Sequence, residues 1–127
     1  MEAAAHSDSR EVIPGGMIPG SGVPAFTLLG VRQAKLPVLI AAPHGGRSYP
    51  AEIESRMRNP GIAKLRLEDR LVDELATAVA DLTGAATLVA HAPRAMLDLN
   101  RAPDDLDWSM LGEGRPTGQV HSSANRR

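Results

Sequence analysis

The sequence predicts an α/β protein in which a mixed sheet is flanked by helices. Two short apolar segments, residues 36–40 and 86–90, have the length and composition of strands, and an amphipathic helical pattern lies between them. A strand, a helix and a second strand in this order are typical of α/β layer folds. With 127 residues, the chain is long enough for one domain with one core, but not for two.

The segment that organises the chain is residues 36–47, L-P-V-L-I-A-A-P-H-G-G-R. Its apolar part is nearly continuous, which favours a strand covered on both faces. Gly45 and Gly46 allow a sharp turn after this strand and leave space for a ligand beside His44. Because open α/β sheets bind ligands at the carboxyl ends of their strands, His44 is a candidate functional residue.

The remaining elements are predicted from composition and spacing. Residues 25–30, A-F-T-L-L-G, read as a first strand that could form a hairpin with the strand around Val38. Pro50 could open a short helix to residue 57 or 58, and the residues Asn-Pro-Gly at 59–61 would end it. A further short strand is expected over residues 95–99.

The longest predicted helix starts near residue 65, where apolar residues recur at three- and four-residue spacing. Gly84 suits a left-handed position that ends this helix. The apolar positions are Leu67, Leu71, Leu75, Ala78, Val79 and Leu82.

Composition excludes several functional classes. A formal net charge of -1 argues against binding to nucleic acid or a membrane surface through charge alone. The chain has no cysteine, which excludes disulfides and thiolate metal sites. The N-terminus carries Glu2 and Asp8, and no apolar stretch approaches the roughly 20 residues that span a bilayer. We therefore expect a cytoplasmic protein.

Three polar clusters could carry chemistry: the His44 turn, the acidic pair Glu68 and Asp69, and residues 98–101, D-L-N-R. An imidazole and a carboxylate can share a divalent metal such as zinc, with one position open for water. The structural alternatives are a surface histidine and acidic residues that stabilise a helix N-terminus. Asn100 and Arg101 are suited to binding a carboxylate, although Arg101 could also be simply solvated.

Three motifs occur in order: P-V-L-I-A-A-P-H-G-G-R, L-E-D-R-L-V-D-E-L and A-P-R-A-M-L-D-L-N-R-A-P-D-D. Together they resemble the N-terminal half of the N-formylglutamate amidohydrolase family, over about residues 25–112. That family is similar in fold to zinc carboxypeptidases and aspartoacylases, which implies a phosphorylase/hydrolase-like fold. The implied reaction, a step of histidine degradation, uses a divalent metal, expected to be zinc, to hydrolyse N-formyl-L-glutamate to formate and L-glutamate.

The resemblance also implies roles for individual residues. His44 would be a metal ligand and Asp69 a second one, with Glu68 a neighbouring candidate. Asn100 and Arg101 would hold the carboxylate of a small-molecule substrate. The remaining residues have secondary roles: Arg94 would assist this pair, Asp98 would position their loop, and Asp73 would lie either behind the metal or on a solvated helix face.

The chain also departs from the family pattern. Family members are longer, and their second half is implied to supply a further histidine ligand and a glutamate that activates water, so we expect a truncated member. His121 lies in a tail unlike the family continuation, and the family pattern offers no metal role for His91. The alternative function is an inactive fragment or a binding module for acidic amino-acid derivatives. The expected organisation is a flexible leader (1–24), the family domain (25–112) and an irregular tail (113–127).

Overall fold

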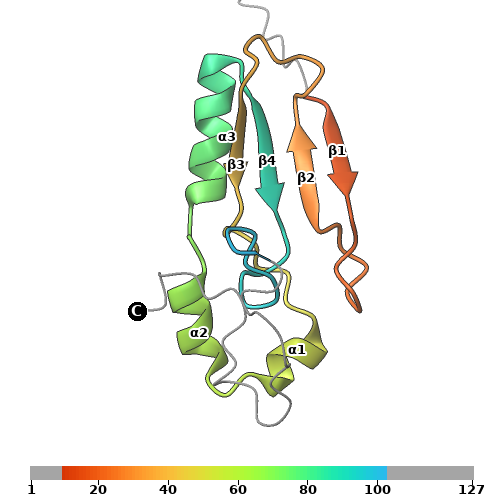
Figure 1. Ribbon diagram of the computed structural model, residues 1–127, viewed down its shortest axis with the longest axis vertical. Helices are drawn as coiled ribbons and strands as arrows, with labels where there is room; N and C mark the ends of the chain where they lie inside the picture. Colours follow the sequence, from red (N-terminus) through yellow and green to blue (C-terminus); the bar gives the residue numbers. More distant parts are fainter. Residues whose placement is uncertain (1–9, 103–127) are drawn as a thin grey trace, which may run out of the picture.

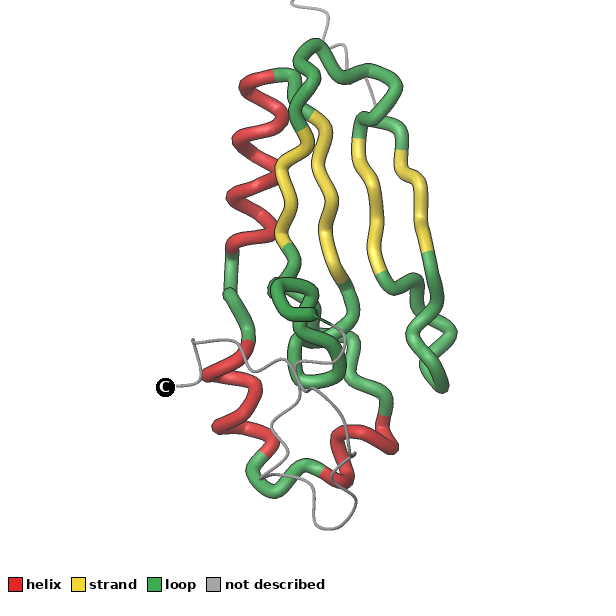
Figure 2. Tube along the Cα trace, in the orientation of Figure 1, coloured by secondary structure: helices red, strands yellow, loops and turns green. Residues whose placement is uncertain are grey.

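A computed structural model describes residues 10–102, which form a four-stranded mixed sheet with a long helix on one face (Figure 1). Two shorter helices lie beyond the end of the sheet (Figure 2). The elements in chain order are β1 (Val12–Gly15), β2 (Phe26–Leu29), β3 (Leu39–Ala42), α1 (Ala51–Arg56), α2 (Pro60–Leu67), α3 (Val72–Thr83) and β4 (Ala86–Ala90). The mixed α/β class is confirmed.

The strand order is β1-β2-β4-β3. The β1–β2 and β2–β4 pairs are antiparallel, whereas β3 and β4 are parallel. The hairpin expected between residues 25–30 and the next strand is therefore wrong, because β4 lies between β2 and β3. A crossover through α3 places the parallel strands β3 and β4 side by side, which a sequence pattern alone does not indicate.

The strand β1 lies within residues 1–24, for which we expected a flexible leader. Val12 pairs opposite Leu29 of β2, and Ile18 in the following loop is buried. The expectation of a leader is therefore wrong for the part that contains β1. Glycine and proline in this segment form the turn after the strand instead of making the whole segment mobile.

Only one face of β3 is covered within the described part of the chain. Ala42 is fully buried, whereas Leu39 is 52% exposed. Successive residues of a strand point to opposite faces, and α3 packs against β3 and β4 from one side. The expectation of a strand covered on both faces is therefore wrong for residues 10–102.

The long helix predicted from residue 65 is divided into α2 and α3. Leu71 has a left-handed backbone with φ 66°, a conformation that no regular helix continues. Gly84 takes the predicted left-handed position at the end of α3, with φ 76°. The residues that face the sheet are Ala76 and Ala80, so α3 packs closely against it through small side chains. Its leucines, Leu75 and Leu82, are exposed.

Of the two remaining local predictions, the helix after Pro50 is confirmed and the strand at residues 95–99 is wrong. Helix α1 begins after Pro50, as expected, but Pro60 also starts α2. The strand expected over residues 95–99 is wrong: these residues form turns in which the backbone N–H groups of Met96 and Leu97 bond to the carbonyl of Pro93.

The core is small and rich in alanine. Its buried apolar residues are Ile18, Ala42, Ala76, Ala80, Ala85, Ala86 and Ala90. In residues 10–102 no helix is both long and apolar enough to cross a membrane. The expected tail, with His121, lies outside the described residues.

Candidate functional site

His44 lies at the carboxyl end of β3, where the sequence predicts it. Its side chain is 8% exposed, and its carbonyl accepts a hydrogen bond from the backbone N–H of Asp69 at 3.0 Å. Gly46 is required nearby, because a Cβ atom there would lie 2.2 Å from the carbonyl oxygen of Ala92. Glycine thus lets the loop after β3 contact the backbone after β4, and this contact holds His44 at the sheet edge.

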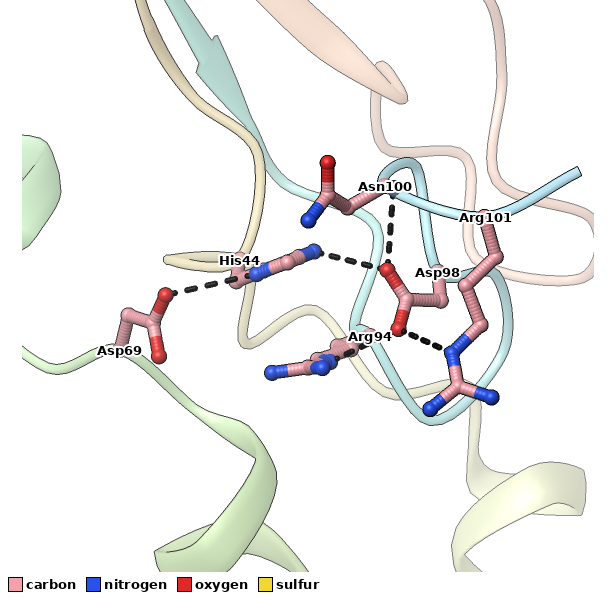
Figure 3. Close-up of polar contacts among 6 residues, drawn as sticks. All are labelled: His44, Asp69, Arg94, Asp98, Asn100 and Arg101. Carbon is pink, nitrogen blue, oxygen red and sulfur yellow. Dashed lines mark hydrogen bonds and ion pairs between the residues drawn. The ribbon is translucent and has the colours of Figure 1, made fainter. Parts of the chain in front are cut away.

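The His44 imidazole lies between two carboxylates (Figure 3). Nε2 is 2.9 Å from Oδ1 of Asp98, and Nδ1 is 3.4 Å from Oδ2 of Asp69. An ionised carboxylate can only accept hydrogen bonds, so Nε2 carries the proton toward Asp98. In the neutral ring, Nδ1 then turns a lone pair toward the Asp69 oxygen, an arrangement that a cation or a second proton between the two atoms would stabilise.

Asp98 joins the histidine to the arginine loop. Its Oδ1 accepts from His44 and from the backbone N–H of Asn100 at 3.0 Å, and its Oδ2 accepts from Nε of Arg94 and of Arg101, each at 3.1 Å. Burial alone would raise the pKa of Asp98, but the Asn100 N–H, His44 and Arg94 outweigh it and lower the pKa from 3.8 to about 2. The sequence predicts a loop-positioning role for Asp98; its contact with His44 is the part that sequence reasoning missed.

The lowered pKa of Asp98 predicts a pH-dependent contribution to stability. A carboxyl group with a depressed pKa stabilises the folded state above its unfolded pKa, and this contribution is lost as the pH falls toward the folded pKa. The difference in unfolding free energy between the wild type and Asp98→Asn should therefore be constant above about pH 5 and shrink between about pH 4 and 2. Urea titrations of the metal-free protein measure it; a difference that does not vary with pH would contradict the assignment.

The three predicted carboxylate-binding residues share one loop. Arg94 and Arg101 each contact Asp98 through Nε. Their terminal guanidinium nitrogens make no hydrogen bond within residues 10–102, and Arg101 is 35% exposed. Asn100 uses its backbone N–H on Asp98 and has an exposed side chain. The loop thus presents two guanidinium groups and an amide beside His44, donors that suit an anionic ligand.

Other residues singled out in the sequence have different partners. The Glu68 side chain is 5% exposed and forms an ion pair with Arg70 at 3.4 Å. Burial, followed by the charge of Glu68, raises the pKa of Tyr49. Glu68 therefore contacts Arg70 and influences Tyr49, and the structure records no contact between it and His44.

Two further residues also bond away from His44. Oδ2 of Asp73 forms an ion pair with Nη2 of Arg47 at 2.8 Å. Nε2 of His91, which follows β4, lies 2.6 Å from Oγ1 of Thr27. Each of these side chains thus has a partner outside the His44 cluster.

The geometry of His44 and Asp69 fits two ligands of one metal ion. Two donors that share a tetrahedral zinc ion at about 2.0–2.2 Å lie roughly 3.4 Å from each other. The Nδ1–Oδ2 distance is 3.4 Å. Residues 10–102 contain no group of three or more His, Cys, Asp or Glu side chains that could hold a metal, so they supply two donors of a set that requires more.

Comparison with known proteins supports the family resemblance inferred from the three motifs. A model of one family, described as FGase, N-formylglutamate amidohydrolase, matches residues 36–126. No curated protein and no solved structure matches the chain. The matched range includes His44, Asp69 and the loop with Asp98, and it covers more than half of the 127 residues. The chain therefore belongs to the N-formylglutamate amidohydrolase family.

Proposed function

We propose that this protein is a metal-dependent amidohydrolase that cleaves the formyl amide of N-formyl-L-glutamate, or of a related N-acyl amino acid, to formate and the free amino acid. The observation that carries the proposal is the arrangement around Asp98. One carboxylate contacts both the histidine of the proposed metal pair and the two arginines of the proposed substrate site. The two functions that such a hydrolase needs are thereby linked through a single side chain.

His44 and Asp69 would hold the cation, for which zinc is expected, through Nδ1 and Oδ2. The chemistry that such a cation supplies when bound is polarisation of the amide carbonyl and acidification of water. Because Nε2 of His44 donates to Asp98, Nδ1 is the ring nitrogen that would be left to hold the cation. Glu68 is outside the proposed pair, because its carboxylate contacts Arg70.

The substrate carboxylate would bind to the terminal guanidinium nitrogens of Arg94 and Arg101 and to the amide of Asn100. Because Asp98 holds both arginines by Nε, their planes are oriented before the substrate arrives. Binding energy at the carboxylate is then available to orient the amide group beside His44.

The second candidate is a binding module that recognises acidic amino-acid derivatives through Asn100 and Arg101 without hydrolysing them. One observation favours it: the described part of the chain brings together two potential metal donors and no third. A site with two protein ligands binds zinc more weakly than the three or four protein ligands of ordinary zinc sites.

Formate release from N-formyl-L-glutamate separates the two candidates. The zinc-supplemented protein should release formate, a chelator should abolish the release, and Arg101→Lys should raise KM about tenfold because lysine lacks the bidentate geometry. Arg32→Lys is the matched control, since Arg32 forms an exposed ion pair with Glu11 away from the site. Calorimetric binding of the substrate without formate release would instead support the binding module.

A further inference from the structure

Arg47 joins the turn after β3 to the start of helix α3. Its Nε donates a hydrogen bond to the Gly45 carbonyl at 3.2 Å, and its Nη2 forms an ion pair with Oδ2 of Asp73 at 2.8 Å. Gly45 follows His44 directly, and Asp73 lies in the first turn of α3, which begins beside the carboxyl end of β3 (Figure 1). We call the residues Gly45, Arg47 and Asp73 the Arg47 clasp. The function proposed above gives the clasp no role.

The clasp is closely packed and partly buried. A Cβ atom at Gly45 would lie 3.2 Å from Cβ of Asp73, so the turn lies directly against that side chain. The Asp73 side chain is 22% exposed, and its second oxygen, Oδ1, is buried without a hydrogen-bond partner within residues 10–102. Burial of a carboxylate is costly unless a cation pairs with it, and in the described part of the chain Arg47 is that cation. This ion pair therefore differs from one between two solvated side chains, which contributes little.

The two proposed metal ligands lie on the two segments that the clasp joins. His44 belongs to the turn after β3, and Asp69 precedes α3. One backbone hydrogen bond, from the Asp69 N–H to the His44 carbonyl at 3.0 Å, connects them directly. Between Asp69 and α3, Leu71 has a left-handed backbone, which persists in a non-glycine residue only where surrounding contacts hold it. The backbone bond before Leu71 and the clasp after it supply such contacts.

We propose that Arg47 is a positioning residue for the pair His44 and Asp69. Through Asp73 it holds the turn after β3 against the start of α3. This contact keeps the Asp69 N–H on the His44 carbonyl, and Nδ1 of His44 3.4 Å from Oδ2 of Asp69. Arginine suits the role because its planar fork presents donors to two acceptors in a fixed geometry, whereas lysine has one ammonium group. The importance of this spacing for metal binding rests on the proposed function; the spacing itself does not.

Hydrogen exchange of the Asp69 amide in the metal-free protein tests the clasp directly. Arg47→Met keeps the aliphatic stem and removes the donors, so this amide should exchange about tenfold faster. The Val89 amide in β4, a strand paired on both sides, should be accelerated much less, which separates a local effect from a loss of overall stability. The matched control is Arg32→Met, because Arg32 forms an ion pair with Glu11 instead, and it should change neither rate.

A second variant determines whether Arg47 acts through Asp73. Asp73→Ala removes the acceptor, and it should accelerate exchange of the Asp69 amide as Arg47→Met does. The double variant should exchange no faster than either single variant, because residues that share one contact have non-additive effects. Asp73→Ala also provides the test if Arg47→Met does not fold.

Zinc titration separates this proposal from the proposed function. If the wild type binds zinc, Arg47→Met should lower the affinity about tenfold, as changes behind metal ligands do, and Arg32→Met should not. Three results would overturn the positioning role: unchanged exchange at Asp69 in Arg47→Met, equal acceleration at Asp69 and Val89, or zinc affinity equal to that of a zinc-binding wild type. A wild type that binds no zinc, with the effect at Asp69 intact, would instead refute the metal function and support the positioning of the pair.

Discussion

Replacement of His44 by glutamine should abolish stoichiometric zinc binding. The Nδ1 atom of His44 and Oδ2 of Asp69 are separated by the distance expected for two ligands of one ion, and Asp98 fixes the ring so that Nδ1 faces that position. Glutamine keeps similar volume and polarity but removes the imidazole nitrogen that zinc prefers. We expect zinc affinity to fall at least 100-fold, since even changes behind the ligands cost about 10–100-fold. Metal analysis after dialysis and calorimetric titration measure this loss.

His91→Gln is the matched control for that experiment. His91 also follows a strand of the parallel pair, but its ring bonds to Thr27. This variant should bind as much zinc as the wild type. Full zinc content in His44→Gln, with an unchanged circular dichroism spectrum, would reject His44 as a ligand.

Substitution of Gly46 by alanine should have the largest effect on stability. The new Cβ atom would lie 2.2 Å from the carbonyl oxygen of Ala92, and the next nearest atoms also belong to the backbone of His91 and Ala92, so no flexible side chain could move away. The loops after β3 and β4 would have to separate, which would also weaken the hydrogen bond from the Ser48 N–H to the His91 carbonyl. We expect a loss of about 2–4 kcal/mol in the free energy of unfolding, measured by urea denaturation.

Gly61→Ala separates this steric effect from the general effect of removing a glycine. Gly61 lies in α2, and no atom lies within 4 Å of the position of an added Cβ. Alanine there should leave stability unchanged or raise it by up to about 1 kcal/mol. Equal stability of Gly46→Ala and the wild type would mean that the two loops do not meet as described.

Much of the secondary structure could be predicted from local patterns. The strand at residues 86–90 and the left-handed glycine at residue 84 are confirmed, because composition and backbone preference determine both. The division of the long helix at Leu71 was missed, because leucine rarely adopts a positive φ and its spacing continued the helical pattern. The turns at residues 95–99 were mistaken for a strand because a short apolar run carries little information about its conformation.

The residues of the candidate site could be predicted from the sequence, but the contacts between them could not. Residue chemistry and the family motifs predicted His44, Asp69, Asn100 and Arg101, but their roles stay proposals. Local spacing did not indicate that Asp98 would contact His44, since the two residues are 54 positions apart. The lowered pKa of Asp98 follows from the hydrogen bond of the Asn100 backbone N–H, from that contact with His44 and from Arg94, which together outweigh the effect of burial.

The sequence by itself determined the α/β class, the family and the kinds of side chain available for chemistry, because these depend on composition, periodicity and motifs along the chain. Only the tertiary structure decided that β4 lies between β2 and β3, and that alanines instead of leucines of α3 face the sheet. It also decided that one aspartate joins His44 to both arginines. The physical reason is that strand partners, buried faces and charge pairs depend on groups far apart in sequence, which meet only when the chain has folded.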